Sequence, residues 1–160
     1  MFHPRRNSFG WVMPLPHISR HDLDSLIATL EVSFVKLAEC LVAPGWRLDL
    51  GCVDVPGIHY SISGSGRIIA NNRLPIELYP HTLVILPKNT LLVLESDDAQ
   101  GRIATRTVKG DSATATPGTV GRFVAGTEGP PLTVICGYFR ALYGPSINLF
   151  EHLQFPIVER

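Results

Sequence analysis

From Gly45 onward the chain is divided into short apolar runs of about five residues, separated by residues that favour turns. The runs are WRLDL, IHYSIS, RIIA, PIELY, TLVILP, LLVL, RFVAG and LTVICGYF. Gly64-Ser65-Gly66 and Asn71-Asn72 are among the turns between them. Many short strands with turn signals between them are typical of a β-sandwich or β-barrel. We therefore predict an all-β fold.

The segment that starts at Asp22 is predicted to be a short helix followed by a strand. Asp22 is the expected N-cap, and Leu23, Leu26, Ile27 and Leu30 share one helical face. Between residues 32 and 42 the apolar residues continue at helical spacing, but three valines favour a strand, so periodicity alone permits one long helix. We end the helix near Glu31, because the downstream runs would give a strand partners.

The first 21 residues have no steady period. They contain three prolines, Pro4, Pro14 and Pro16, which fit neither a helix interior nor a central strand. We expect residues 1–21 to be an N-terminal arm that is ordered only where it packs, with Phe9 and Trp11 as its anchors. The chain has 160 residues, about the size of one ordinary domain. Residues 22–160 are therefore predicted to form one folding unit.

A polar stretch and the C-terminal tail are the least regular parts of the sequence. Between Glu95 and Pro131 the chain is rich in Asp, Gly, Thr, Ser and Ala, and GDSATATPGTVG is its least hydrophobic part. Such a stretch is either a mobile flap or binding loop, or a disordered insertion. In the tail, Ser146 is expected to cap a short helical turn that ends at Pro156. The apolar residues of that turn are Ile147, Leu149, Phe150 and Leu153.

Charge and cysteine content exclude some classes of partner. The 14 Lys and Arg residues balance the 14 Asp and Glu residues, so the formal net charge is zero. A surface that holds duplex DNA carries excess positive charge, so we expect this chain alone not to bind DNA well. Cys40, Cys52 and Cys136 form no CxxC pair and leave one thiol over, which favours a reducing compartment. Because no signal peptide or membrane-spanning run is found, we expect a cytoplasmic protein with no membrane partner.

Three segments, HYSISGSGRI, PHTLVILPKNTLLVL and TVICGYF, resemble in order and spacing three landmarks of one regulator family. They are similar to the sensor domain that precedes the DNA-binding helices in AraC/XylS-type transcription regulators. Upstream, Pro44, Gly45 and Trp46 are similar to the family's strand entry, although here the glycine precedes the tryptophan. At the C-terminus, LFEHLQFPIV is similar to its short Leu-rich helix followed by a proline. The resemblance covers nearly everything from Asp22 to Arg160.

The resemblance implies a cupin double-stranded β-helix (jelly roll), a double sheet that leaves few edges open. It also implies that DNA is contacted only through helix-turn-helix units, which need about another hundred residues of basic helical sequence. Those units are absent from this chain. We therefore expect either a fragment of a longer regulator, which we favour, or a stand-alone relative.

Cupin enzymes hold a divalent metal through two His and a Glu on one strand and a third His on a later strand. In this chain LGCVDVPG has no HxH pair, Gly57 stands at or near the place of the glutamate, and Leu92 at or near that of the later histidine. The resemblance therefore implies a non-catalytic domain with no metal and no cofactor. A remnant metal site of Cys52, Asp54 and His59 would have poor spacing for the usual geometries.

The candidate binding residues follow from strand alternation. His59 and Ser61 share one face of a strand, and Tyr60 and Ile62 share the other. His59 and Ser61 either point into the barrel to orient a ligand, or His59 is a buried histidine satisfied by a backbone carbonyl. Trp46 is either an aromatic wall of the pocket or plain core, which we favour, and Leu92 is expected to line the pocket. Cys136 is expected to be an inert buried thiol.

These observations predict a small-molecule-sensing regulatory domain that binds an effector inside the barrel. We also expect a weak homodimer, formed through the apolar tail residues between Ile147 and Leu153. Two alternatives stay open. One is a small metal-dependent cupin enzyme, an isomerase or a dioxygenase, and the other is a structural dimerisation module whose barrel is filled.

Overall fold

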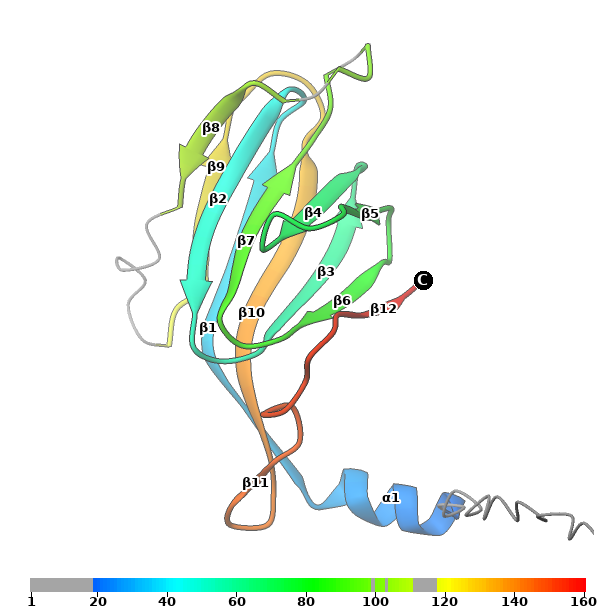
Figure 1. Ribbon diagram of the computed structural model, residues 1–160. Coiled ribbons are helices and arrows are strands. Elements are labelled where there is room, and N and C mark those ends of the chain that lie inside the picture. Colours follow the sequence, from blue (N-terminus) through cyan, green and yellow to red (C-terminus); the bar gives the residue numbers. More distant parts are fainter. Residues whose placement is uncertain (1–18, 99, 103, 111–117) are drawn as a thin grey trace, which may run out of the picture.

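A computed structural model describes residues 19–98, 100–102, 104–110 and 118–160 (Figure 1). In this part of the chain two β-sheets face each other, and a short helix and an extended ribbon lie at one end. The helix is α1 (Arg20–Ala28). The predicted all-β fold is confirmed, and each of the eight predicted runs contains a strand.

The larger sheet has seven strands. Its order is β12-β6-β3-β10-β1-β9, and β11 pairs with β10 outside this path. The bounds are β1 (Leu30–Val42), β3 (Gly57–Ser63), β6 (Leu83–Leu86), β9 (Gly121–Ala125), β10 (Leu132–Tyr143), β11 (Ile147–Asn148) and β12 (Ile157–Glu159). The pairs are antiparallel except for β1 with β9, which run parallel.

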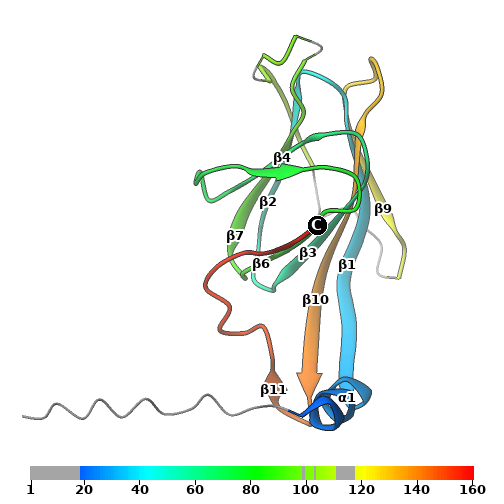
Figure 2. The same ribbon diagram turned by 90° about the vertical axis from the view of Figure 1, so that its right-hand side faces the viewer.

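The smaller sheet has five strands in the order β5-β4-β7-β2-β8. The bounds are β2 (Trp46–Val53), β4 (Gly66–Ala70), β5 (Ile76–Leu78), β7 (Thr90–Glu95) and β8 (Arg106–Lys109). Here only β2 and β8 run parallel among the pairs described. Figure 2 shows the two sheets from the side, with β4 and β7 on one side of the molecule and β1 and β9 on the other.

The core lies between the facing sheets and follows from alternation along each strand. In β2 and β7, Leu48, Leu50, Leu92 and Leu94 are buried, while the residues between them are partly exposed. Each leucine removed from water in this way contributes roughly 1.5–3 kcal/mol. The inner face of the larger sheet supplies smaller residues, including Cys40, Val42, Val134 and Cys136.

The start of the helix differs from the prediction. Ser19, and not Asp22, is the N-cap, because its Oγ accepts a hydrogen bond from the backbone N–H of Asp22 at 3.1 Å. Asp22 lies in the first helical turn, and the Ser19 hydroxyl donates to its carboxylate at 2.6 Å. The helix therefore begins at Arg20, and the predicted boundary between residues 21 and 22 falls inside it.

The predicted strand after the helix is confirmed, although the helix ends at Ala28, earlier than the expected end near Glu31. β1 begins at Leu30 and pairs with β10 from Leu30 opposite Tyr143 to Val42 opposite Leu132. The backbone hydrogen bonds of this long pairing stabilise a strand, although the leucines of the segment have helical spacing. Figure 1 and Figure 2 show the first half of β1 and the end of β10 leaving the body of the sheets as a two-stranded ribbon beside α1.

The polar stretch between Glu95 and Pro131 contains two strands, so the prediction of one long loop is wrong in part. β8 pairs with β2 and β9 with β1, both in parallel. Only β9, which overlaps RFVAG, was expected as a strand. Residues 111–117, most of GDSATATPGTVG, lie outside the described residues, as do Phe9 and Trp11 of the arm.

The helical turn predicted for the tail does not form. Ile147 and Asn148 form β11, and hydrogen-bonded turns follow. The backbone N–H of Leu149 donates to the carbonyl of Ala141 on β10, so Ser146 caps no helix. β12 then pairs with β6. Hydrogen bonds to β10 and β6 therefore hold the tail extended, although its apolar residues have helical spacing.

In the described part of the chain no helix has the length and apolar character that crossing a bilayer requires.

Candidate functional site

His59 and Ser61 point into the space between the sheets. His59 is 1% exposed and Ser61 is fully buried, whereas Tyr60 and Ile62 are 38% and 44% exposed. The alternation predicted for this strand is therefore confirmed. β3 lies between β10 and β6, which places His59 opposite Cys136 on one neighbour and Val84 on the other.

The His59 ring lies over Gly57 and meets Tyr138 edge-on. The two ring centroids are 6.1 Å apart with an interplanar angle of 84°. A Cβ added at Gly57 would come within 2.6 Å of Nε2 of His59. The missing side chain at Gly57 therefore provides the space that the imidazole fills. Any larger residue here, including a glutamate, would require the ring to move.

The buried polar atoms of this region lack partners. Among the described residues, no hydrogen bond is made by Nδ1 or Nε2 of His59, Oγ of Ser61 or Oη of Tyr138. The alternative in which a backbone carbonyl satisfies His59 is therefore wrong for the described part of the chain. An unsatisfied buried polar group costs roughly 1–3 kcal/mol. These groups share the interior faces of β3 and β10, so their unused hydrogen-bonding capacity is concentrated in one region.

Burial sets the protonation of both rings. Desolvation lowers the pKa of His59 from 6.5 to about 3, so its imidazole is neutral at physiological pH and offers one donor and one acceptor. Desolvation raises the pKa of Tyr138 far above physiological pH, so its hydroxyl keeps its proton. The site presents neutral hydrogen-bonding groups rather than charges.

Tyr138 borders two interior spaces. The first lies beside His59, includes Gly57, Leu86 and Leu92 in its lining, and is too narrow to admit a water molecule. The second contains about 360 Å³ not filled by atoms, including space open to solvent. Its lining residues are Lys36, Leu37, Ala38, Cys40, Leu50, Phe123, Cys136 and Tyr138.

The structure brings some of the predicted site residues together and leaves one apart. His59 and Leu92 line the same space, and Ser61 is buried two residues further along β3. Trp46 borders neither space. It packs against the core, with the Arg106 guanidinium 5.3 Å from its ring centroid. Trp46 stands at the start of β2 and lines neither of these two spaces, so its role as a pocket wall stays a prediction.

Sequence analysis predicted none of the residues that line the larger space as ligand-binding, among them Lys36, Cys40, Phe123 and Tyr138. The inward position of Tyr138 could have been predicted, because Val134, Cys136 and Tyr138 alternate along one strand and therefore share a face. The same alternation with Ala38 and Cys40 could have predicted that Lys36 points inward. No local pattern predicted that Phe123 lines this space, because it reaches the space only through the parallel pairing of β9 with β1.

The thiols support no metal site in this geometry. A hydrogen bond with the Cys40 thiol, and then burial, raise the pKa of Cys136, as expected for an unreactive buried thiol. Cys52 and Asp54 are exposed while His59 is buried, so the hypothetical set of Cys52, Asp54 and His59 does not assemble. Within the described ranges, no three His, Cys, Asp or Glu residues are grouped closely enough to hold a metal ion.

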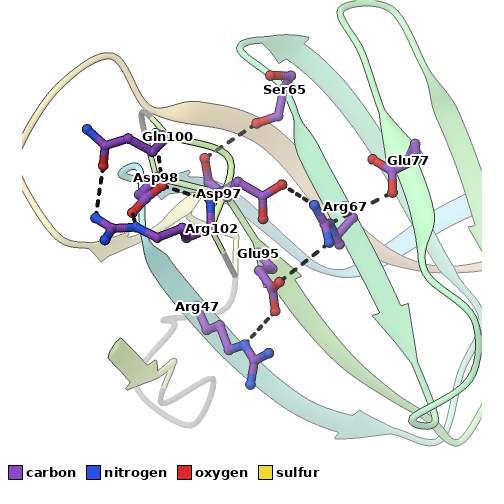
Figure 3. Close-up of polar contacts among 10 residues, drawn as sticks. Arg47, Ser65, Arg67, Glu77, Glu95, Asp97, Asp98, Gln100 and Arg102 are labelled. Atoms are coloured by element: carbon purple, nitrogen blue, oxygen red, sulfur yellow. Dashed lines mark hydrogen bonds and ion pairs between the residues drawn. The ribbon is translucent and has the colours of Figure 1, made fainter. Parts of the chain in front are cut away.

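A second polar cluster lies on the outer face of the smaller sheet (Figure 3). Glu95 of β7 is 1% exposed and pairs with Arg47 of β2 at 2.5 Å and with Arg67 of β4 at 3.9 Å. Arg67 also pairs with Asp97 and with Glu77 of β5. Charges of alternating sign thus cross four adjacent strands, and the two arginines cover the glutamate. The arrangement joins strands to each other and encloses no cavity of its own.

No protein-family model matches the chain, and a search of curated proteins finds no match to it. The resemblance to AraC/XylS-type sensor domains therefore stays an expectation from sequence.

Proposed function

We propose that this chain is a non-catalytic sensor domain with the cupin jelly-roll fold, of the kind found in AraC-type transcription regulators. Its effector is a small molecule that binds between the two sheets. The chain needs no cofactor for this role and acts in the cytoplasm. DNA is contacted only through a helix-turn-helix domain that is not part of this chain.

One observation carries the proposal: unpaired polar groups line the interior of an otherwise apolar core. His59, Ser61 and Tyr138 are buried on adjacent strands without partners among the described residues. Apolar walls with a few convergent polar groups have the composition of small-molecule sites. A ligand that bonds to these groups offsets the cost of burying them, which gives binding a source of affinity.

The test is a ligand screen followed by NMR. We expect a small, partly polar organic compound to shift the resonances of the His59 ring and of the amides of Cys136 and Tyr138. His59→Ala should weaken binding of that compound by about 1–2 kcal/mol, a factor of roughly 5 to 30, with the fold retained.

Tyr60→Phe is the matched control, because Tyr60 is the next residue on β3 and faces outward. It removes only the exposed hydroxyl that contacts Nδ1 of His81 at 2.7 Å. This variant should bind like the wild type. Equal affinity of His59→Ala and wild type would contradict the assigned role of His59, and about one equivalent of iron, manganese, nickel or zinc retained after dialysis would favour the metal-dependent enzyme.

A second candidate is a structural dimerisation module with a filled barrel. It is favoured by the space beside His59, which admits no water, and by α1, which buries none of its residues. The NMR screen separates the two functions. A dimerisation module would show concentration-dependent shifts at the ribbon and none in the interior with any compound.

A further inference from the structure

The larger interior space has a lysine at its edge. Lys36 lies on β1 at the same alternation as Ala38, Cys40 and Val42, whose side chains are buried on the inner face of the sheet. It is half-buried, lines the space, and makes no ion pair or hydrogen bond with another described residue. The nearest acid along the strand, Glu39, has the opposite alternation and pairs with Arg122 at 3.3 Å.

This position is unusual for a cation. A charged group turned toward a core costs free energy unless a counter-ion or hydrogen bonds compensate it. Strand alternation directs Lys36 inward, and among the described residues nothing of opposite charge meets it there. Within the described residues the Lys36 ammonium therefore lacks an anionic partner, and an anion bound in this space would offset the cost of its partial burial.

The rest of the lining is apolar apart from a few neutral groups. Leu50 of β2 and Phe123 of β9 supply hydrocarbon walls, and the thiols of Cys40 and Cys136 also line the space. The hydroxyl of Tyr138 is buried, unpaired among the described residues and protonated, so it is a free donor. The enclosed part holds little more than one water molecule, so most of a bound ligand would occupy the part of the space that is open to solvent.

These features select a class of ligand. A sugar needs many polar partners, and this lining has too few. A phosphate or other dianion needs several cations, and Lys36 is the one charged residue among the described residues that line the space. A cationic ligand would be repelled. A compound with one negative charge and an apolar body fits this lining, because the charge can meet Lys36 and the apolar body can contact the hydrocarbon side chains.

We propose that this space binds a small organic monocarboxylate, with its carboxylate at the Lys36 ammonium and its apolar body against Leu50, Phe123 and β10. The inference rests on the proposed function and names the effector class for the same interior. Tyr138 borders this space and the one beside His59, so a ligand seated here touches Tyr138, one of the unpaired interior groups.

The experiment uses four acids as probes: hexanoate, octanoate, benzoate and 3-phenylpropanoate, each beside its primary amide. Affinities are measured by NMR titration of the full chain. We expect at least one acid to bind with shifts at Cys136 and Tyr138, and its amide to bind about tenfold more weakly or not at all. Lys36→Met should weaken the acid by about tenfold and leave the amide unchanged, while Lys36→Arg keeps most of the affinity.

Lys109→Met is the matched control, because Lys109 is exposed on β8 and lines neither space. It should leave every affinity unchanged, and thermal unfolding of all three variants checks that they are folded. Equal binding of acid and amide, or no effect of Lys36→Met, would overturn the ligand class. If neutral compounds enter the interior and no acid does, the inference fails and the proposed function stands. If no compound of any kind enters, both fail.

Discussion

The burial of His59 has a consequence for the whole protein's response to pH. In the unfolded chain this imidazole has a pKa near 6.5, and in the folded chain its pKa is about 3. Between these values the unfolded state binds a proton that the folded state does not. The free energy of unfolding therefore falls as pH falls, by at most about 1.4 kcal/mol per pH unit. The contribution of the neutral, buried imidazole to stability is fully present above pH 6.5, and it is lost as pH falls from 6.5 toward 3.

We predict a loss of about 2 kcal/mol of stability between pH 7 and pH 5 from this residue alone. Urea unfolding at each pH measures it as the difference between wild type and His59→Phe, whose ring does not titrate. His81→Asn is the control histidine variant, because His81 is exposed and has φ 71, a conformation that asparagine adopts readily. It should keep the pH dependence that His59 provides. A His59→Phe variant with the full wild-type slope would contradict the prediction.

At the scale of elements, the smaller sheet is held partly by the charges across its outer face. Glu95 lies opposite Arg47 on one neighbouring strand and opposite Arg67 on the other. The glutamate is almost fully buried, so it depends on both partners to compensate its lost hydration. Removing it leaves two half-covered arginines facing each other across β7.

We expect Glu95→Gln to lower the free energy of unfolding by about 2–3 kcal/mol, because the neutral amide cannot compensate both guanidinium groups. Glu128→Gln is the matched control. Glu128 is 83% exposed and pairs with Arg106 only at 4.0 Å, so its loss should cost less than about 0.5 kcal/mol. Chemical denaturation of the two variants side by side measures the difference. Equal losses would show that the buried ion pairs do not stabilise the sheet.

Considered as a whole, the molecule exposes apolar side chains at the ribbon end. Ile27 of α1, Phe34 of β1 and Ile147 of β11 are each more than half exposed. The predicted dimer patch in the tail is partly covered by the chain itself, because Phe150 packs edge-on against Phe139 with ring centroids 5.2 Å apart. Ile147 and Leu149 remain available.

We predict a weak homodimer through this end, detected by sedimentation velocity over a range of concentrations. Ile147→Asp should shift the equilibrium toward monomer, since it places a charge in an apolar contact. Leu74→Asp is the control, because Leu74 is 89% exposed in the turn between β4 and β5. It should self-associate like the wild type. A wild-type chain that stays monomeric at high concentration would exclude the dimer.

Local pattern was enough to predict the strands from Trp46 to Leu94 and the inward face of His59 and Ser61. The reason is that the period of two is a property of the strand backbone and needs no knowledge of neighbours. The same rule placed Tyr60 and Ile62 outside. The turns were equally local, since Asn71 and Asn72 adopt the positive φ values that such residues favour.

The parts that sequence alone did not determine depend on pairing between distant segments. β8 forms because it adds in parallel to β2, the predicted strand β9 is placed by its parallel pairing with β1, and the tail is extended because β10 and β6 supply partners. The larger space is formed in the same way, by Lys36, Phe123 and Tyr138 from three strands. Alternation predicts that a side chain faces inward, but the register of the whole sheet decides which inward side chains meet. Sequence therefore determined the strands from Trp46 to Leu94, whereas tertiary packing decided β8, the extended tail and the candidate ligand site.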